Sequence, residues 1–356
     1  MNVALRSMVG NESVAETLLR GIAVDDLPQS LLFVGPEGVG KATFARAVAA
    51  AAGCVSPTDG DACGACSHCR RVVADQHPDF VRIAPDGDTT KIWQLWSRSG
   101  HPDGALETLP FAPVSARQRH YVIERADTLN DESANSLLKA LEEPPPYVRF
   151  ILCTPSEDAV LETIRSRCRM VRFQRVPVER IRTALAVGTA ADPDAADRWA
   201  ALAEGAPGRA LRWALAPETF AARERIVELA VALSSAPPIG ALRYAEALRG
   251  GGAKKKSASD ADGEEGSARS ELARSIEWLG LWYADLLRLA TAGPGVRLVH
   301  EPWRTEAEAA ARRHKPEALR ASVDDCLVFR HHVMRNANAA LASEALLLRL
   351  ARRANS

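Results

Sequence analysis

The sequence predicts an α/β fold, in which a parallel sheet flanked by helices is followed by helical segments. Up to about residue 175, short apolar runs alternate with amphipathic stretches, as expected of strands joined by crossover helices. From about residue 177 the strand patterns stop and helical patterns continue. The 356 residues are too many for one ordinary domain and suit two or three.

The elements of the first part can be placed in chain order by their hydrophobic periodicity. Pro144–Pro146 ends the last of its helices, because proline cannot continue one. We expect strands at residues 31–34, 80–83, 120–124, 150–154 and 171–173, and helices at residues 13–24, 43–52, 91–98 and 134–142.

Composition narrows the class of protein. Hydrophobic residues make up 47% of the chain and charged residues 25%, the balance of a soluble globular protein. No apolar run reaches the length of a membrane span, and the first residues lack the apolar core of a leader. We therefore expect a cytoplasmic protein without membrane contact. The net charge of zero indicates that any contact with DNA is local or shared with partners.

A glycine-rich loop follows the first predicted strand and opens a helix. Gly35, Gly38, Gly40 and Lys41 fit the phosphate-loop pattern, in which backbone N–H groups and the lysine surround phosphate oxygens. The pattern next requires Ser or Thr as a Mg²⁺ ligand, but this chain has Ala42. The loop therefore predicts phosphate-loop architecture without hydrolysis, and leaves open whether nucleotide binds or the glycines only make a turn.

The end of the strand at residues 120–124 also lacks residues that ATP hydrolysis needs. A hydrolysing site places Asp-Glu there, to hold Mg²⁺ and to polarise water. This chain has Glu124 and Arg125. Glu124 could hold a metal weakly, but a guanidinium does not give up its proton and cannot be a general base. Two changed positions in one reaction predict a subunit that does not hydrolyse ATP.

Four of the seven cysteines lie close together in the chain. Cys54, Cys63, Cys66 and Cys69 form a Cys-x8-Cys-x2-Cys-x2-Cys pattern, which suits a closed tetrahedral zinc site with a structural role. An iron–sulfur cluster and four free thiols are the alternatives. His68 lies between two ligands and is interpreted as a bystander.

Arginines mark two further places. Arg167 stands between a helix and the strand at residues 171–173, where a guanidinium can reach a phosphate on a neighbouring subunit. Its alternative is a surface arginine paired with an acid. Arg209 opens a later helix and is a weak signal by itself. Residues 250–270, rich in Gly, Ser, Lys and acids, are expected to be disordered.

Several stretches together resemble the clamp-loader family of bacterial DNA polymerase III, which is built on AAA+ modules. Residues 135–144 are similar to a family helix, Ser166–Cys168 to its Ser-Arg-Cys motif, and the cysteine spacing to its zinc module. His77–Asp79 and the stretch from Asn336 to Leu350 resemble segments of its delta-prime proteins. Because Ala42 and Arg125 depart from the gamma/tau pattern, the resemblance is to the delta-prime type.

The resemblance implies an organisation and a role. A RecA-like AAA+ domain would span residues 1–175 with a zinc module at 54–69, a helical lid 176–215, and a helical collar for oligomerisation 216–356. Arg167 would act in trans as an arginine finger on an adjacent ATPase subunit. Partners would be gamma/tau and delta subunits and, through the complex, the sliding clamp and primed DNA. The cofactor would be structural zinc, with ATP binding open.

Two alternatives remain from the sequence. The first is an ATP-hydrolysing clamp-loader subunit of the gamma/tau type, against which Ala42 and Arg125 speak. The second is a stand-alone zinc-bearing P-loop nucleotide kinase, which would need an intact Mg²⁺ position and leaves the long C-terminal helical region unexplained. In the preferred interpretation the chain is part of a polymerase holoenzyme, which is a nucleotidyltransferase, and is not itself an active ATPase.

Overall fold

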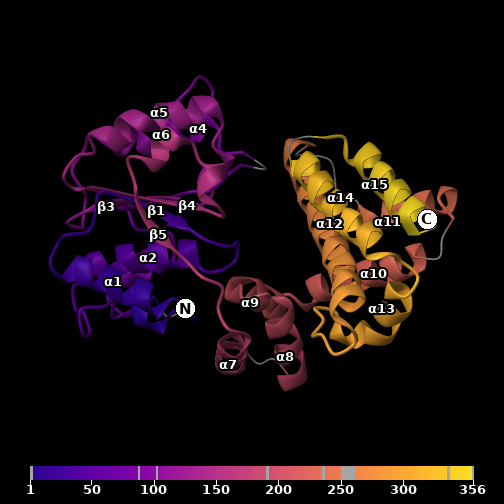
Figure 1. Ribbon diagram of the computed structural model, residues 1–356. Helices are drawn as coiled ribbons and strands as arrows, with labels where there is room; N and C mark the ends of the chain where they lie inside the picture. The colour runs from indigo at the N-terminus through magenta and orange to yellow at the C-terminus, as the bar shows by residue number, and fades with distance from the viewer. Residues whose placement is uncertain are drawn as a thin grey trace. The chain divides into compact units, whose positions relative to one another are not determined.

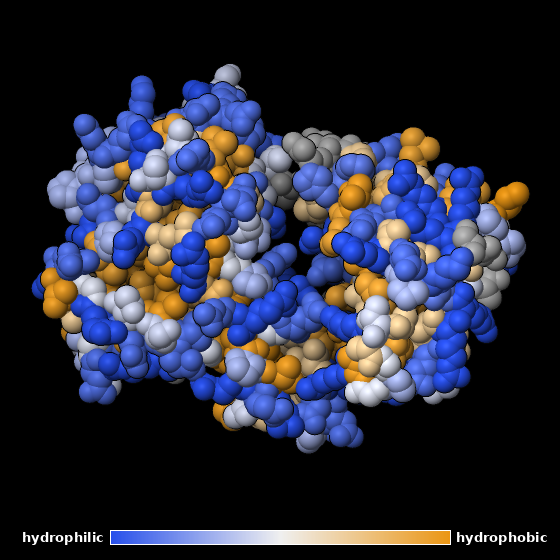
Figure 2. All heavy atoms as spheres, in the orientation of Figure 1, coloured by the Kyte–Doolittle hydropathy of each residue, from blue (hydrophilic) through white to orange (hydrophobic). Residues whose placement is uncertain are grey.

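The computed structural model separates into two compact units, residues 1–214 and 215–356, each with a core of its own (Figure 1). Polar residues cover much of the visible face of both units, with apolar residues gathered in patches (Figure 2). No helix in the part of the chain that is described is long and apolar enough to cross a membrane. The structure describes residues 3–86, 89–101, 103–189, 192–234, 237–249, 261–334 and 337–354.

A five-stranded parallel sheet organises the first unit, which confirms the predicted α/β class. Its order is β2-β3-β4-β1-β5, with Leu32 of β1 opposite Leu152 of β4 and Met170 of β5. The strands are β1 (Ser30–Val34), β2 (Phe80–Ile83), β3 (Arg119–Ile123), β4 (Val148–Thr154) and β5 (Arg169–Arg172).

Helices cover both faces of this sheet (Figure 1). On one face, Leu32 and Val34 join the core with Leu137 of α5. Toward the other face, the rings of Phe33 and Phe44 each lie 5.0 Å from that of Phe173. The helices of this part are α1 (Glu12–Ala23), α2 (Lys41–Ala52), α3 (Ser67–Val73), α4 (Ile92–Leu95), α5 (Asp131–Glu142) and α6 (Glu162–Arg165).

Two helices differ most in length from the sequence prediction. The helix expected at residues 91–98 is only α4, because Trp96 adopts extended backbone and the N–H of Ser97 donates to a carboxylate oxygen of Glu107 at 2.9 Å. In contrast, α5 begins three residues earlier than expected. Asn130 caps it by accepting the N–H of Ser133 at 2.8 Å, which fixes the first turn.

Three more helices complete the first unit: α7 (Val178–Gly188), α8 (Pro193–Leu202) and α9 (Pro207–Leu215). The turn before α9 is held to the chain that leaves β5, because the N–H of Val176 donates to the carbonyl of Gly205 at 2.8 Å. Gly205 has a left-handed backbone, with φ of 82°, which glycine adopts without steric cost. This turn determines where α9 begins.

The second unit is helical. Trp282 is buried in its core with Leu279 and Leu346, and Asp325 of α14 pairs with Arg349 and Arg353 of α15. Of the tract expected to be disordered, residues 250–260 lie outside the described residues, and from residue 261 the chain is helical. Asn336 also lies outside them. The helices are α10 (Pro217–Leu233), α11 (Ala245–Leu248), α12 (Ala261–Ala292), α13 (Arg304–Ala311), α14 (Pro316–Met334) and α15 (Ala339–Ala354).

Candidate functional site

The predicted phosphate loop lies at the carboxyl end of β1. Gly38 and Gly40 have left-handed backbone angles, with φ of 79° and 107°, which residues with side chains adopt only at a cost. Lys41 is the first residue of α2. The structure thus brings Gly35, Gly38, Gly40 and Lys41 together at the amino end of a helix, where backbone N–H groups favour anions.

The amine of Lys41 is turned into its own loop. Nζ donates to the carbonyl oxygens of Gly35 at 2.6 Å and Pro36 at 2.9 Å, and the residue is only 9% exposed. Burial lowers the pKa of Lys41, although Cys153 and acidic neighbours act in the opposite direction. A phosphate at this loop would have to compete with two carbonyl oxygens for the amine.

The amino end of α9 packs directly on the phosphate loop. The N–H of Gly208 donates to the carbonyl of Gly38 at 2.9 Å. A Cβ on Gly38 would lie 3.2 Å from that of Ala206, and a Cβ on Gly208 would lie 3.0 Å from the Gly38 oxygen. The backbone of the α9 amino end is therefore in direct contact with the backbone of the phosphate loop. Arg209 follows directly and pairs with Glu204 at 3.8 Å.

The positions that hold Mg²⁺ in a hydrolysing site carry other groups. Ala42, the second residue of α2, ends in a methyl group. Beyond β3, Arg125 makes three hydrogen bonds to both carboxylate oxygens of Asp127, at 2.8–3.1 Å. Glu124, the predicted weak metal ligand, accepts a hydrogen bond from Arg82 at 3.1 Å. Its carboxylate is therefore already engaged by a cation of the protein.

The four clustered cysteines could hold one metal ion. Their sulfur atoms all lie within 4.8 Å of one another. The Sγ atoms of Cys54 and Cys69 are 3.7 Å apart, close to the edge of about 3.8 Å that tetrahedral Zn–S bonds give. The N–H groups of Cys63, Cys66 and Cys69 donate to Sγ of the preceding cysteine at 3.3–3.4 Å. Burial raises the pKa of Cys54 and Cys69, whereas at Cys66 the hydrogen bonds outweigh burial and lower the pKa to about 6. The donor set thus fits a metal that binds thiolates.

His68 uses both ring nitrogens away from the sulfur atoms. Its Nδ1 lies 2.8 Å from Nε2 of His77, and its Nε2 lies 3.0 Å from the carbonyl oxygen of Ala49. His77 Nδ1 accepts the N–H of Asp79 at 3.1 Å, so its Nε2 is the donor when the ring is neutral. Hydrogen bonds then run in one direction, from Asp79 through both rings to Ala49. The pair links α3 to α2 and to the start of β2.

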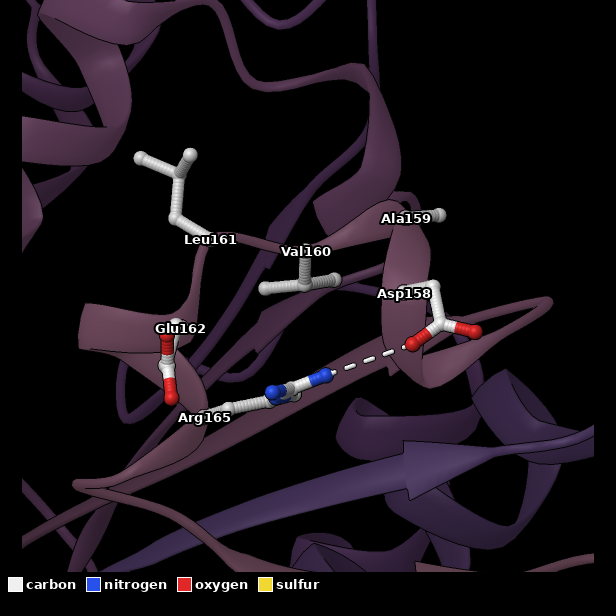
Figure 3. Close-up of a pocket in the computed structure, with 6 residues that line it drawn as sticks. All are labelled: Asp158, Ala159, Val160, Leu161, Glu162 and Arg165. Atoms are coloured by element: carbon white, nitrogen blue, oxygen red, sulfur yellow. Dashed lines mark hydrogen bonds and ion pairs between the residues drawn. The ribbon is translucent and has the colours of Figure 1, made fainter.

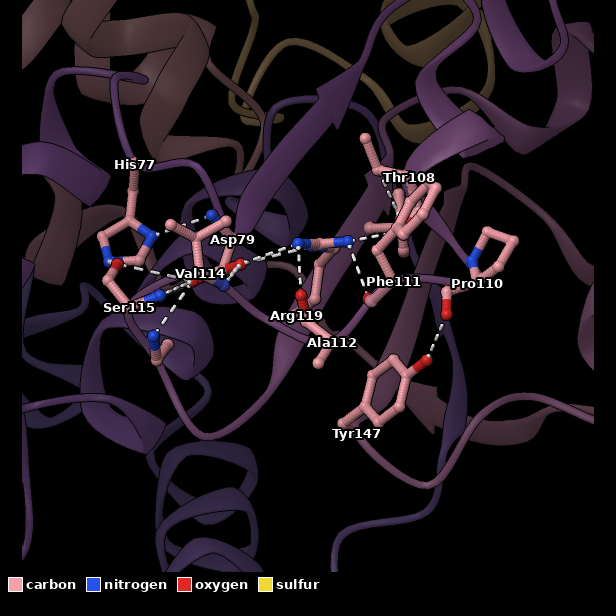
Figure 4. A network of polar contacts seen from close by, with 12 residues as sticks. His77, Asp79, Thr108, Pro110, Phe111, Ala112, Val114, Ser115, Arg119 and Tyr147 are labelled. Carbon is pink, nitrogen blue, oxygen red and sulfur yellow. Dashed lines mark hydrogen bonds and ion pairs between the residues drawn. The ribbon is translucent and has the colours of Figure 1, made fainter.

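A buried ion pair lies at the end of this chain of hydrogen bonds (Figure 4). Asp79 accepts the backbone N–H groups of residues 114–116 at 2.7–2.9 Å and pairs with Arg119 at 3.1 Å. Arg119 also donates to the carbonyl oxygens of Phe111 and Ala112, at 3.1 and 3.2 Å. One buried pair thereby fixes the backbone of a surface loop.

Arg167 lies between α6 and β5, with 33% of its side chain exposed. Its Nη1 donates to the carbonyl of Thr163 at 2.9 Å and approaches Oγ of Ser166 at 3.4 Å. Its Nη2 forms an ion pair with the carboxylate of Glu142 at the end of α5. The guanidinium is therefore accessible and held by three groups of its own chain.

An open hollow of about 350 Å³ lies just before Arg167 in the chain (Figure 3). Arg165 faces Asp158 across it at 3.4 Å, and 41% of Leu161 is exposed. The hollow is lined by Asp158, Ala159, Val160, Leu161, Glu162 and Arg165. Its walls come from one short segment, so it is a surface feature and not an enclosed site.

Sequence reasoning did not assign roles to two acidic residues of the site. Asp127 stands two residues after Arg125 with the opposite charge, and this spacing could have indicated the pair. Glu142 is 25 positions from Arg167, and no local pattern in the sequence connects them. Only the packing of α5 beside α6 does so.

Comparisons with known proteins bear on the first half of the chain. Residues 10–177 match the family described as DNA polymerase III, delta subunit. DNA polymerase III subunit tau of Escherichia coli is 32% identical over 175 residues, which cover 49% of this chain and 26% of tau. DNA polymerase III subunit delta' of Bacillus subtilis is 32% identical over 161 residues, which cover 45% of this chain and 46% of that protein.

A solved structure, that of a DNA polymerase III gamma subunit-related protein from Thermotoga maritima, aligns with 95% of this chain and 99% of its own. The identity is 17% and the TM-score 0.43. The matched part of the curated relatives is less than half of their length. Residues 10–177 therefore match the DNA polymerase III delta family and are similar to parts of the DNA polymerase III subunits named tau, gamma and delta'.

Proposed function

We propose that this chain is a clamp-loader subunit of DNA polymerase III of the delta-prime type, which does not hydrolyse ATP itself. It assembles with gamma/tau and delta subunits, and that complex loads the sliding clamp onto primed DNA. Residues 176–215 serve as the helical lid, and residues 216–356 as the collar that assembles the complex. Arg167 acts in trans on the ATP bound by the neighbouring subunit.

The observation that carries the proposal is the state of the phosphate loop. Lys41 is bound to two carbonyl oxygens of the loop, and Ala42 offers no ligand to Mg²⁺. Arg125 and Asp127, which are paired, both act electrostatically on Lys41 and so lie near it. The carboxylate of Asp127 is therefore already engaged by a cation of the protein, as that of Glu124 is by Arg82. These features support a phosphate loop that has a structural role and does not take part in ATP hydrolysis.

Arg167 supports the second part of the proposal. It is accessible, stands at the edge of an element, and belongs to a Ser-Arg-Cys stretch. A guanidinium is always charged and offers a planar fork of N–H donors suited to phosphate. In phosphoryl transfer such a group, supplied in trans, stabilises charge that develops on the transferred phosphoryl group.

The arginine can be tested in a loader reconstituted from its subunits. We expect Arg167→Ala to lower ATP hydrolysis stimulated by clamp and DNA, because an arginine finger contributes a factor of about 10³–10⁵ at the site it serves. Assembly should survive, which gel filtration checks. Arg172→Ala removes another exposed arginine with an acidic partner and should leave hydrolysis unchanged. Equal hydrolysis by wild type and Arg167→Ala would refute the trans role.

The relatives named tau and gamma favour a second candidate, an ATP-hydrolysing subunit. The two candidates differ in what the purified chain does alone. We expect no ATP turnover above background, because the groups that hold Mg²⁺ and activate water are replaced. Steady turnover that depends on Mg²⁺ and is lost in Lys41→Ala would establish the second candidate instead.

We also propose that the cysteine cluster holds one structural zinc ion. Elemental analysis of the purified chain should give about one zinc per molecule, and Cys66→Ser should lose it. Because the metal would join α3 to the segment around Cys54, chelation should increase hydrogen exchange in residues 54–73 before it affects β4. Iron, or no metal, in the freshly purified chain would contradict the assignment.

A further inference from the structure

The guanidinium of Arg167 is held by a carboxylate from another part of the fold. Glu142 ends α5, and Arg167 follows α6. The two side chains form an ion pair, and the carbonyl of Thr163 fixes the other terminal nitrogen at 2.9 Å. Contacts to both Nη atoms define the plane of the guanidinium as well as its position.

The place of Glu142 on its helix makes this contact informative. A carboxylate in the last turn of a helix faces the negative end of the helix dipole and is disfavoured there. Glu142 is the last residue of α5, and it is also about half exposed. Neither helix formation nor burial of apolar surface explains an acid at this position, whereas the pairing with Arg167 does.

The contacts leave part of the guanidinium available. The Nη groups donate to Glu142, Thr163 and Ser166, while the Nε–H of Arg167 has no acceptor among the residues that the structure describes. An arginine can therefore stay bound to Glu142 and still donate to an oxygen of another molecule. Holding it in advance removes the rotamer freedom that a long side chain would otherwise lose in the reaction.

We infer that Glu142 is a positioning residue, which sets the orientation in which Arg167 meets the triphosphate of an adjacent subunit. The inference rests on the proposed trans role of Arg167. Glu142 touches no substrate and acts only through the arginine. Its removal should therefore weaken stabilisation of the transition state without changing how tightly the neighbour binds ATP.

The test uses the complete reconstituted loader, with clamp and primed DNA, and measures hydrolysis over a range of ATP concentrations. We expect Glu142→Ala to lower kcat about two- to fivefold, the size of an exposed ion-pair effect, with KM for ATP unchanged. Glu142→Asp keeps the charge and should retain more activity than Glu142→Ala. Glu157→Gln disrupts the similar exposed pair with Arg172 and should match wild type.

A double substitution separates positioning from a general structural role. In the Arg167→Ala background, Glu142→Ala should have no further effect, because its influence passes through the arginine. Additive losses would overturn the inference, and so would a wild-type kcat in Glu142→Ala. A kcat above wild type in Glu142→Ala would also overturn it, because the ion pair would then restrain the arginine. If Arg167→Ala itself has full activity, the proposed function fails. If only Glu142→Ala does, the function stands and the inference falls.

Discussion

Asp79 and Arg119 show how single buried charges shape this protein. Their side chains are 0% and 3% exposed, and each makes several hydrogen bonds to one surface loop. On that loop, 68% of Phe111 and 74% of Val114 is exposed. The buried ion pair thus fixes the backbone of a loop whose two apolar side chains are exposed to water. A loop with such support keeps one conformation, although its own side chains contribute little to a core.

Removing one member of this pair should be costly. We expect Asp79→Asn to lower the free energy of unfolding by about 3–5 kcal/mol, because Arg119 would remain buried without its counter-charge. Urea unfolding at neutral pH measures the change. Asp158→Asn is the control: it removes an exposed partner of Arg165 and should cost about 0–1 kcal/mol. Equal effects of the two substitutions would contradict the importance of burial.

The same carboxylate predicts a pH dependence. Burial raises the pKa of Asp79, but the N–H groups of residues 114–116 and Arg119 outweigh it and hold the pKa below the ordinary 3.8. The folded protein therefore binds this proton less readily than the unfolded chain does. The stabilisation is fully present above about pH 5 and is lost progressively as the pH falls through 3.8 toward the folded-state pKa. The difference in stability between wild type and Asp79→Asn should shrink in that range alone.

At the scale of elements, α2 joins two parts of the candidate site. Its first residue, Lys41, belongs to the phosphate loop. Near its other end, the carbonyl of Ala49 accepts a hydrogen bond from His68 of the cysteine segment. Gly53, which caps the helix, lies so close that a Cβ there would stand 2.2 Å from the His68 ring. A displacement of the cysteine segment would therefore act on the helix that carries the phosphate loop.

Gly53→Ala tests this contact. The backbone of Gly53 suits any residue, with φ of −108°, so the expected effect is steric. We expect a loss of about 1–3 kcal/mol in the free energy of unfolding, as for other overpacked sites, together with faster release of zinc to a chelator. Gly188→Ala, where a Cβ would meet nothing within 4 Å, should not lower the free energy of unfolding and should leave zinc release unchanged. Unaltered zinc release in Gly53→Ala would argue against the coupling.

The order of strands and helices could be predicted because each has a continuous hydrophobic period in the chain. The strand at residues 31–34 and the helix at residues 13–24 each lie within one residue of β1 and α1. The helix α3 could not be predicted, because Ser67–Val73 lies among cysteines whose spacing suggests a ligand loop. The cysteine cluster could be predicted, because its members lie close together in the sequence. The pairing of Glu142 with Arg167 could not be predicted, because it depends on how α5 and α6 pack.

At the scale of the whole molecule, the chain consists of two units with separate cores. The core of residues 215–356 contains Trp278, Trp282 and Tyr283. Contacts between α12 and α14 are close, since a Cβ on Gly280 would lie 3.2 Å from that of Cys326. A helical unit with its own aromatic core satisfies the requirement for independent folding.

We therefore expect residues 215–356, expressed alone, to be helical and to unfold cooperatively. Circular dichroism followed during heating measures both properties. Trp282→Ala should lower the melting temperature of this fragment strongly, because replacing a fully buried tryptophan costs about 3–5 kcal/mol. In the full chain, the same substitution should leave residues 1–214 folded, because they have a core of their own. A fragment that lacks a cooperative transition would show that its core depends on the first unit.

The strand order also has a consequence for how the protein is made. Strand β1 pairs with β4 and β5, and both are encoded far downstream. At a synthesis rate of about 5–20 residues per second, the roughly 115 residues from β1 to β4 take about 6 to 23 seconds. For about that long, the apolar stretch Leu31–Val34 is outside the ribosome before either neighbouring strand has emerged. A nascent chain in that state exposes the apolar side chains of β1, which are buried in the folded protein. We therefore expect this protein to need a chaperone while it is still bound to the ribosome.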